Sequence, residues 1–205
     1  MKQRDYTGIV PPQFTGREIE AEATRKLEDE RAAIKFFAIA RKRLLDVNNW
    51  NKIAGAITAQ FQIIDEKGKE VNREVNKGDY LRINIPGPGS KQGDGYDWVF
   101  VEEIKEVTME FVQSVGFRVR PNENPFSEKN ETAHFYSDEA SSSFIITRED
   151  AKIISWIIDR NLLPNTESAS LVNKVRDVAV GLSAIAGFSK IQWQRLADGL
   201  IESEK

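Results

Sequence analysis

Residues 142–160 read SSFIITREDAKIISWIIDR, and this stretch decides the fold class. Two mostly apolar segments, Ser142 to Arg148 and Lys152 to Arg160, flank the polar pair Glu149-Asp150, which is typical of a β-hairpin with a tight turn. Alternate residues of a strand share a face, and on the second segment one face carries Ile154, Trp156 and Ile158. The stretch therefore predicts two antiparallel strands.

Four further strands are expected upstream of this hairpin. Apolar and polar residues alternate in the segments 57–63, 81–85 and 111–120, whereas the segment 96–107 is apolar on both faces near its start. With the hairpin they give a curved antiparallel sheet of about six strands over residues 56–160. The face expected to meet the C-terminal helix carries Phe61, Ile83, Val115, Phe117 and Trp156.

A long N-terminal helix is expected over residues 15–50. Thr15 and Glu18 have the spacing of a capping box, and Phe14 and Ile19 are placed as a hydrophobic staple. The segment that follows has no proline or glycine until its end and is rich in helix-forming residues. Its first half is charged around most of its surface, and a thin apolar stripe there could serve as a dimer contact.

An amphipathic C-terminal helix is expected after Pro164, with one face that would cover the sheet. That face carries Leu171, Val175, Val178, Leu182 and Ile185. Gly187 suits the left-handed residue that ends a helix, and directly after it Ser189 and Gln192 repeat the capping-box spacing. The helix is therefore expected to break at Gly187 and to be followed by a shorter one from Lys190 to Glu202.

These elements predict one α+β domain over residues 1–205. It would consist of an extended arm (1–14), the N-terminal helix (15–50), the antiparallel sheet (56–160) and the C-terminal helices (165–203). The length suits one substantial core, and 40% hydrophobic with 30% charged residues is ordinary for a globular domain.

Composition excludes several kinds of site and partner. Cysteine is absent and His134 is the single histidine, so disulfides, thiolate chemistry and zinc sites are not expected, and we expect no metal or cofactor. A net charge of −3 gives no broad basic surface for nucleic acid. No apolar run approaches the roughly 18–20 residues of a membrane span. A signal segment is also lacking at the start, which predicts a cytoplasmic protein.

Three motifs are candidate sites of chemistry. The Gly/Pro-rich loop 86–95 lacks the P-loop ending and is followed by a strand, so it is interpreted as a strand-to-strand loop at a cavity mouth. Asp94 and Asp97 lack the spacing of a calcium loop. Glu102 and Glu103 are consecutive strand residues, so only one of them is expected to face inward.

The segment before the sheet carries a further pattern, Asp46 followed by Trp50 within LLDVNNW. With the order of elements, it resembles the helix-grip fold of START-like and polyketide-cyclase-type domains, in which an Asp followed shortly by Trp often precedes the meander. The resemblance covers residues 35–188. It implies a cavity between the curved sheet and the C-terminal helix that binds an apolar small molecule or lipid, and it does not imply catalysis.

The predicted function is therefore non-catalytic binding of a hydrophobic small molecule or lipid in that cavity. The residues expected to line the cavity are Trp98, Phe117, Trp156, Phe61 and Ile83. Two alternatives stay open. One is an interaction or assembly protein that forms a homodimer through the N-terminal helix. The other is an enzyme of cyclase, isomerase or hydrolase type, which would need an inward carboxylate or His134 in the cavity.

Overall fold

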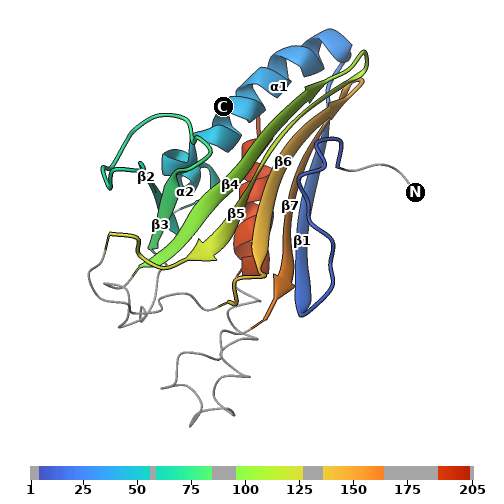
Figure 1. Cartoon of the computed structure of the whole chain (residues 1–205). Helices are drawn as coiled ribbons and strands as arrows, with labels where there is room; N and C mark the ends of the chain where they lie inside the picture. The colour runs from blue at the N-terminus through green and yellow to red at the C-terminus, as the bar shows by residue number, and fades with distance from the viewer. Residues whose placement is uncertain (1–4, 56–58, 85–95, 127–135, 164–188, 204–205) are drawn as a thin grey trace.

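Seven antiparallel strands form one curved sheet in the order β1-β7-β6-β5-β4-β3-β2 (Figure 1). The computed structural model describes residues 5–55, 59–84, 96–126, 136–163 and 189–203. The strands are β1 (Arg17–Lys26), β2 (Gln60–Ile64), β3 (Tyr80–Asn84), β4 (Asp97–Thr108), β5 (Val112–Asn122), β6 (Ser141–Glu149) and β7 (Lys152–Leu162). The sequence predicted six of these strands, including the β6–β7 hairpin, and missed β1.

The helices pack on one face of this sheet, which we call the inner face. They are α1 (Glu30–Leu45), a 3-10 turn (Val47–Asn49), α2 (Trp50–Ala54) and a C-terminal helix described over 189–200. A strand, two helices, six strands and a final helix held against a curved antiparallel sheet make a helix-grip architecture, as the resemblance implied. None of the helices described here is long and apolar enough to cross a bilayer.

The predicted N-terminal helix over 15–50 was wrong in its first half, because β1 occupies that segment. β1 pairs with β7, and Ile19 lies opposite Asp159. Along β1, Ile19 and Ala21 point inward and are buried, whereas Glu22 is exposed. Pairing with β7 buries the apolar side chains of β1. This burial outweighs the helix propensity of the charged residues that alternate with them. Because Phe14 is 68% exposed, it forms no staple with the buried Ile19, and the proposed dimer stripe does not exist as a helix face.

Helix α1 begins instead at Asp29. The Asp29 carboxylate accepts a hydrogen bond from the backbone N–H of Ala32 at 2.7 Å, which is the geometry of an N-cap. The buried residues of α1 are Ala33, Phe36, Phe37, Ala40, Leu44 and Leu45. They form one continuous stripe against the sheet, so the second half of the predicted helix is confirmed.

Trp50 fills the centre of the inner core and is 1% exposed. Its ring lies 5.1 Å from that of Phe61, 5.8 Å from Phe117 and 4.8 Å from Phe144. Its indole N–H donates to the carbonyl oxygens of residues 43 and 44, at 3.1 Å each, which no longer have helical partners at the end of α1. Trp50 therefore joins the end of α1 to strands β2, β5 and β6.

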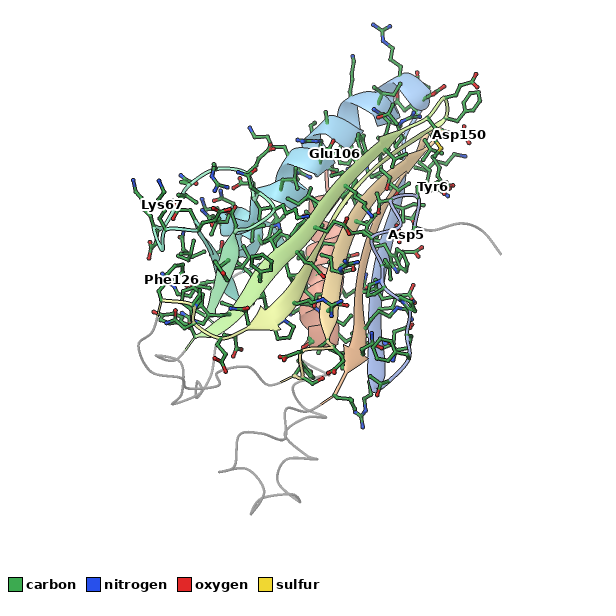
Figure 2. All side chains as sticks on the ribbon, in the orientation of Figure 1. Asp5, Tyr6, Lys67, Glu106, Phe126 and Asp150 are labelled. Atoms are coloured by element: carbon green, nitrogen blue, oxygen red, sulfur yellow. The ribbon has the colours of Figure 1, made fainter. Side chains whose placement is uncertain are left out.

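The opposite, outer face of the sheet carries an N-terminal arm over residues 5–16 (Figure 1). Ile9 of the arm is fully buried and packs in a small second core with Ile145, Trp156 and Ile158. At one end of the arm, the Tyr6 hydroxyl donates to Glu149 near the β6–β7 turn (Figure 2). The arm thus buries apolar residues of β6 and β7 that point away from the helices.

At its other end the arm is fixed by Asn161. The Asn161 side-chain oxygen accepts from the backbone N–H groups of Phe14 and Thr15, and its NH₂ group donates to the carbonyl of Pro12. The chain then turns at Gly16, where φ is +61° and a Cβ atom would lie 2.4 Å from a β7 carbonyl oxygen. Only glycine fits that close approach.

Four of the five residues predicted to share the inner face do so, namely Phe61, Ile83, Val115 and Phe117. The fifth, Trp156, was predicted wrongly, because it lies in the second core on the outer face. β7 is apolar on both faces here, so its alternation does not distinguish inside from outside. The predicted covering residues, Leu171, Val175, Val178 and Leu182, and the break at Gly187 lie outside the described residues.

The position of the α1 cap predicts a difference between two variants. Asp29→Ala should lower the free energy of unfolding by about 1 kcal/mol, because it removes an N-cap. Thr15→Ala, at the cap position expected from the sequence, should change it by less than about 0.5 kcal/mol. Urea denaturation of both variants measures the difference, and a larger loss for Thr15→Ala would contradict this helix start.

Candidate functional site

The inner face includes the ionisable side chains of Asp97 at the start of β4, Asp159 near the end of β7, and Tyr136 ahead of β6. The backbone N–H of Ser137 donates to the carbonyl of Leu163 at 2.9 Å, which places Tyr136 beside the end of β7. β4 begins and β7 ends at the same end of the sheet (Figure 1). The three residues therefore belong to one end of the inner face.

Asp159 is the most deeply buried of the three, with 4% of its surface exposed. It stands opposite Ser142 of β6 and Ile19 of β1, and its Oδ2 accepts from the Trp193 indole N–H at 2.8 Å. Burial raises the pKa of this carboxyl to about 6, and hydrogen bonds from Ser142 and Trp193 partly offset that rise. Among the described residues, its buried Oδ1 has no hydrogen-bond partner.

Asp97 lies opposite Ile83 of β3, so the two side chains share the inner face. Burial raises the pKa of its carboxyl to about 7. Its buried Oδ1 also has no hydrogen-bond partner within the described part of the chain. The calcium pairing considered for Asp97 involves Asp94, which lies outside the described residues. Among those that are described, no group of three acidic or histidine side chains could hold a metal ion.

Tyr136 responds to both aspartates. Burial, together with the negative charges of Asp159 and Asp97, raises the pKa of its phenol to about 12, and Arg17 acts in the opposite direction. The charges of both carboxyls therefore act on the phenol. The phenol can donate or accept a hydrogen bond. The two carboxyls, whose pKa values are near neutrality, can also exchange a proton with a bound molecule.

The residues predicted to line a cavity divide between the two faces. Phe61, Phe117 and Ile83 lie on the inner face, where Phe61 is 6.4 Å from the ring of Trp193 and Ile83 faces Asp97 across the strands. Trp98 and Trp156 lie on the outer face and cannot line a cavity between the sheet and the C-terminal helix. The sequence placed Trp98 wrongly because its strand begins with apolar residues on both sides.

On the outer face, Trp98 stands opposite Arg82 and packs against Phe126, with ring centres 6.1 Å apart. Trp156 donates its indole N–H to Glu20 at 2.8 Å. Both tryptophans therefore have partners that belong to the outside of the sheet.

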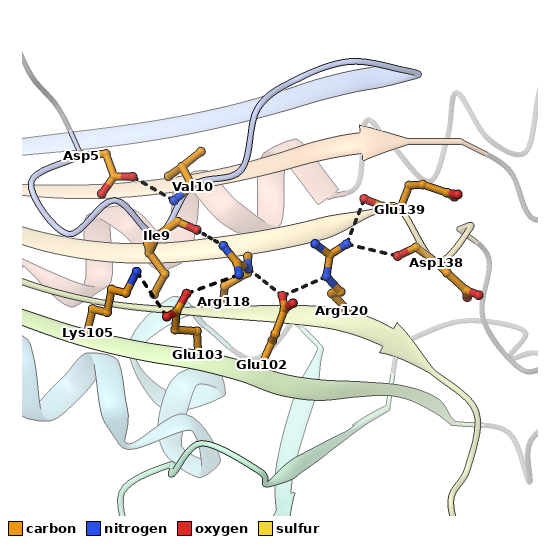
Figure 3. Close-up of polar contacts among 10 residues, drawn as sticks. All are labelled: Asp5, Ile9, Val10, Glu102, Glu103, Lys105, Arg118, Arg120, Asp138 and Glu139. Carbon is orange, nitrogen blue, oxygen red and sulfur yellow. Dashed lines mark hydrogen bonds and ion pairs between the residues drawn. The ribbon is translucent and has the colours of Figure 1, made fainter.

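Glu102 and Glu103 both face outward, so the prediction that one of them enters the interior was wrong. A β-bulge lies between Val101 and Glu103, and it removes the alternation across these residues. Arg118 pairs with both glutamates, through Glu102 at 2.7 Å and Glu103 at 3.3 Å (Figure 3). Arg118 also donates to the carbonyl of Ile9, so this charged cluster helps to hold the arm.

Sequence reasoning missed Asp159 and Tyr136 and considered Asp97 only as a calcium ligand. A signal for Asp159 existed, because it continues the alternate row Ile153, Ser155 and Ile157 on the face opposite Trp156. His134 and the loop 86–95, the other residues weighed for chemistry, lie outside the described residues.

No model of a known family matches this sequence, and no curated protein matches it. Among solved structures, the chain is similar to Ara h 8.0201 over 88% of this chain and 99% of that one, at 13% identity and a TM-score of 0.36. It is also similar to truncated norcoclaurine synthase from Thalictrum flavum over 95% of this chain and 100% of that chain, at 8% identity and a TM-score of 0.39.

A third similar structure is the di-domain ARO/CYC BexL from the BE-7585A biosynthetic pathway. The match covers 91% of this chain and 51% of BexL, at 10% identity and a TM-score of 0.40. Because all three scores are low, the helix-grip architecture is established by the strand order and helix positions described above.

The raised pKa values of Asp97 and Asp159 predict a pH dependence of stability. Because burial raises their pKa values to about 7 and about 6, the folded chain binds more protons than the unfolded chain above about pH 4. Their contribution to stability is therefore complete below about pH 4 and is lost as the pH rises through 6 to 7. Asp159→Asn and Asp97→Asn should each be more stable, relative to the wild type, at pH 8 than at pH 5.

Urea denaturation at both pH values measures this effect, with Asp198→Asn, at an exposed aspartate of the C-terminal helix, as the matched control. The control should keep the wild-type difference between the two pH values. A stability difference between Asp159→Asn and the wild type that does not change with pH would refute the raised pKa.

Proposed function

We propose that this chain binds a small, largely apolar molecule between the inner face of the sheet and the C-terminal helix, at the end that carries Asp97, Tyr136 and Asp159. The observation that carries the proposal is the pair of buried carboxyl oxygens without partners among the described residues. A buried polar group left unpaired costs about 1–3 kcal/mol, and among the buried side-chain atoms without a partner in the described residues these two are the ones that belong to carboxyl groups. A ligand that donates hydrogen bonds to them would remove this cost.

The surroundings of these carboxyls support a ligand that is mainly apolar. The inner face is rich in aromatic rings, and Trp193, which binds Asp159, also packs edge-on against Phe144 at 5.2 Å. Ile83 adds a half-buried apolar side chain directly opposite Asp97. Burial of apolar ligand surface on such residues contributes roughly 25 cal/mol per Å².

One observation favours an enzyme as the second candidate. Two carboxyls whose pKa values lie at about 6 and about 7 can each act as a proton donor or acceptor near neutral pH. Binding alone does not need this property. The helical stripe on which the assembly alternative was based does not exist, because residues 17–26 form strand β1.

Ligand binding predicts a thermal shift that depends on the inner face. Hydrophobic compounds should raise the melting temperature of the wild type in proportion to the logarithm of their concentration. Ile83→Trp should abolish this shift by filling the space beside Asp97. Phe100→Trp introduces the same side chain at a half-buried position on the outer side of β4 and should leave the shift unchanged.

Native mass spectrometry of the purified protein provides an independent measurement, because a retained ligand adds mass to the folded chain. An absence of retained mass, together with no thermal shift across a hydrophobic library, would reject the binding proposal. An equal shift in Ile83→Trp and the wild type would place the binding site elsewhere.

A further inference from the structure

We infer that the molecule bound at this end of the inner face is an organic cation, namely an apolar compound with a protonated amine that pairs with Asp159 and lies close to Asp97 and Tyr136. This inference rests on the binding function proposed above and names its ligand class. The arrangement of charge, the fixed position of the Asp159 carboxyl and the aromatic surroundings each support it.

The charge of the site is incomplete without a cation. Among the described residues, each ion pair joins an arginine or lysine to some other carboxylate, and none involves Asp97 or Asp159. Arg148, a buried arginine of β6, does have an ion-pair partner, because it pairs with Glu30 at 3.2 Å. Asp97 and Asp159 differ from it in this respect. A buried carboxylate is stable in the ionised form only when a positive charge or several donors lie beside it.

The Asp159 carboxyl is held ready for such a partner. The Trp193 indole fixes Oδ2 at 2.8 Å, and this leaves Oδ1, which is buried and has no partner among the described residues. The side chain as a whole is more than nine-tenths buried. An acceptor whose orientation is already fixed loses little conformational entropy when a donor binds it.

A neutral or anionic ligand fits the site less well than a cation. The groups whose charges act on the phenol of Tyr136 are Asp159 of β7, Asp97 of β4 and, in the opposite direction, Arg17 of β1. Since Arg17 is exposed, the buried groups of this set are acidic, and a carboxylate or phosphate on the ligand would be repelled. An alcohol can donate one hydrogen bond but brings no charge.

The aromatic rings near Asp159 also favour a cation. Trp193 lies within 5.2 Å of Phe144 and 6.4 Å of Phe61, measured between ring centres. The faces of such rings attract ammonium groups, and the attraction is strongest for tryptophan. Apolar parts of the same ligand can pack on these rings.

Three naphthalene probes that differ in one group provide the test: 2-(1-naphthyl)ethylamine, 2-(1-naphthyl)ethanol and 1-naphthylacetic acid. Isothermal titration calorimetry at pH 7.5 should show the amine binding at least tenfold more tightly than the alcohol, and the acid should be the weakest. Asp159→Asn should weaken amine binding at least tenfold and leave alcohol binding within threefold. Asp198→Asn should bind all three probes as the wild type does.

The pH dependence gives a second readout. A cation needs ionised carboxyls, so amine affinity should rise between pH 5 and pH 8, and binding near pH 6 should release protons to the buffer. An alkyl amine, with a pKa of about 10, stays protonated throughout this range. Alcohol affinity should not rise with pH. Asp97→Asn should reduce the rise, which provides a variant to test if Asp159→Asn does not fold.

The results that would contradict the inference are the following. Equal binding of the amine and the alcohol, or tighter binding of the acid, would reject the cation while the proposed binding function stands. The same conclusion follows if Asp159→Asn folds and binds the amine as the wild type does. If none of the three probes binds to the wild type, the inference is rejected, and the proposed function is then decided by the thermal-shift and mass measurements described above.

Discussion

The burial of Trp50 is the interaction on which the rest of the fold depends. Its indole N–H closes the last turn of α1 by donating to two carbonyl oxygens, and its ring packs on aromatic residues from three strands. The junction between α1 and α2 is thereby fixed to the middle of the sheet. Since the C-terminal helix packs against the same junction, with Gly199 beside the backbone of Ile53, its position follows from that of Trp50.

Much of this architecture could be predicted from the sequence, because alternating patterns specify strands well. β2, β3 and β5 follow that pattern, the β6–β7 hairpin follows from two mostly apolar segments about a polar turn, and the Asp46 and Trp50 pair correctly indicated the helix grip. The pair has structural roles here, since the Asp46 carboxylate accepts from the Asn49 side chain at the bend after α1. β1 was missed because its charged residues favour a helix in isolation, and only pairing with β7 makes it a strand.

The faces of the strands were harder to predict than the strands themselves. Trp156 and Trp98 lie in segments that are apolar on both sides, and the sequence does not show that an N-terminal arm covers part of the outer face. The bulge at Glu102 is likewise invisible in the pattern, yet it turns two consecutive glutamates to the same side. The position of Asp159 on the inner face could not be predicted without knowing that Trp156 points outward, because the two residues lie on opposite faces of β7.

The arm has a consequence for how the chain acquires its structure. Tyr6 and Phe14 are made first, yet their partners Glu149 and Asn161 lie more than 140 residues later in the chain. Contacts of such large sequence separation close slowly, and here they cannot form until the β6–β7 hairpin has been synthesised. Once Trp156 and Ile158 have been synthesised, they form an uncovered apolar strip until the arm packs on them, and the nascent chain is most vulnerable to aggregation in that interval.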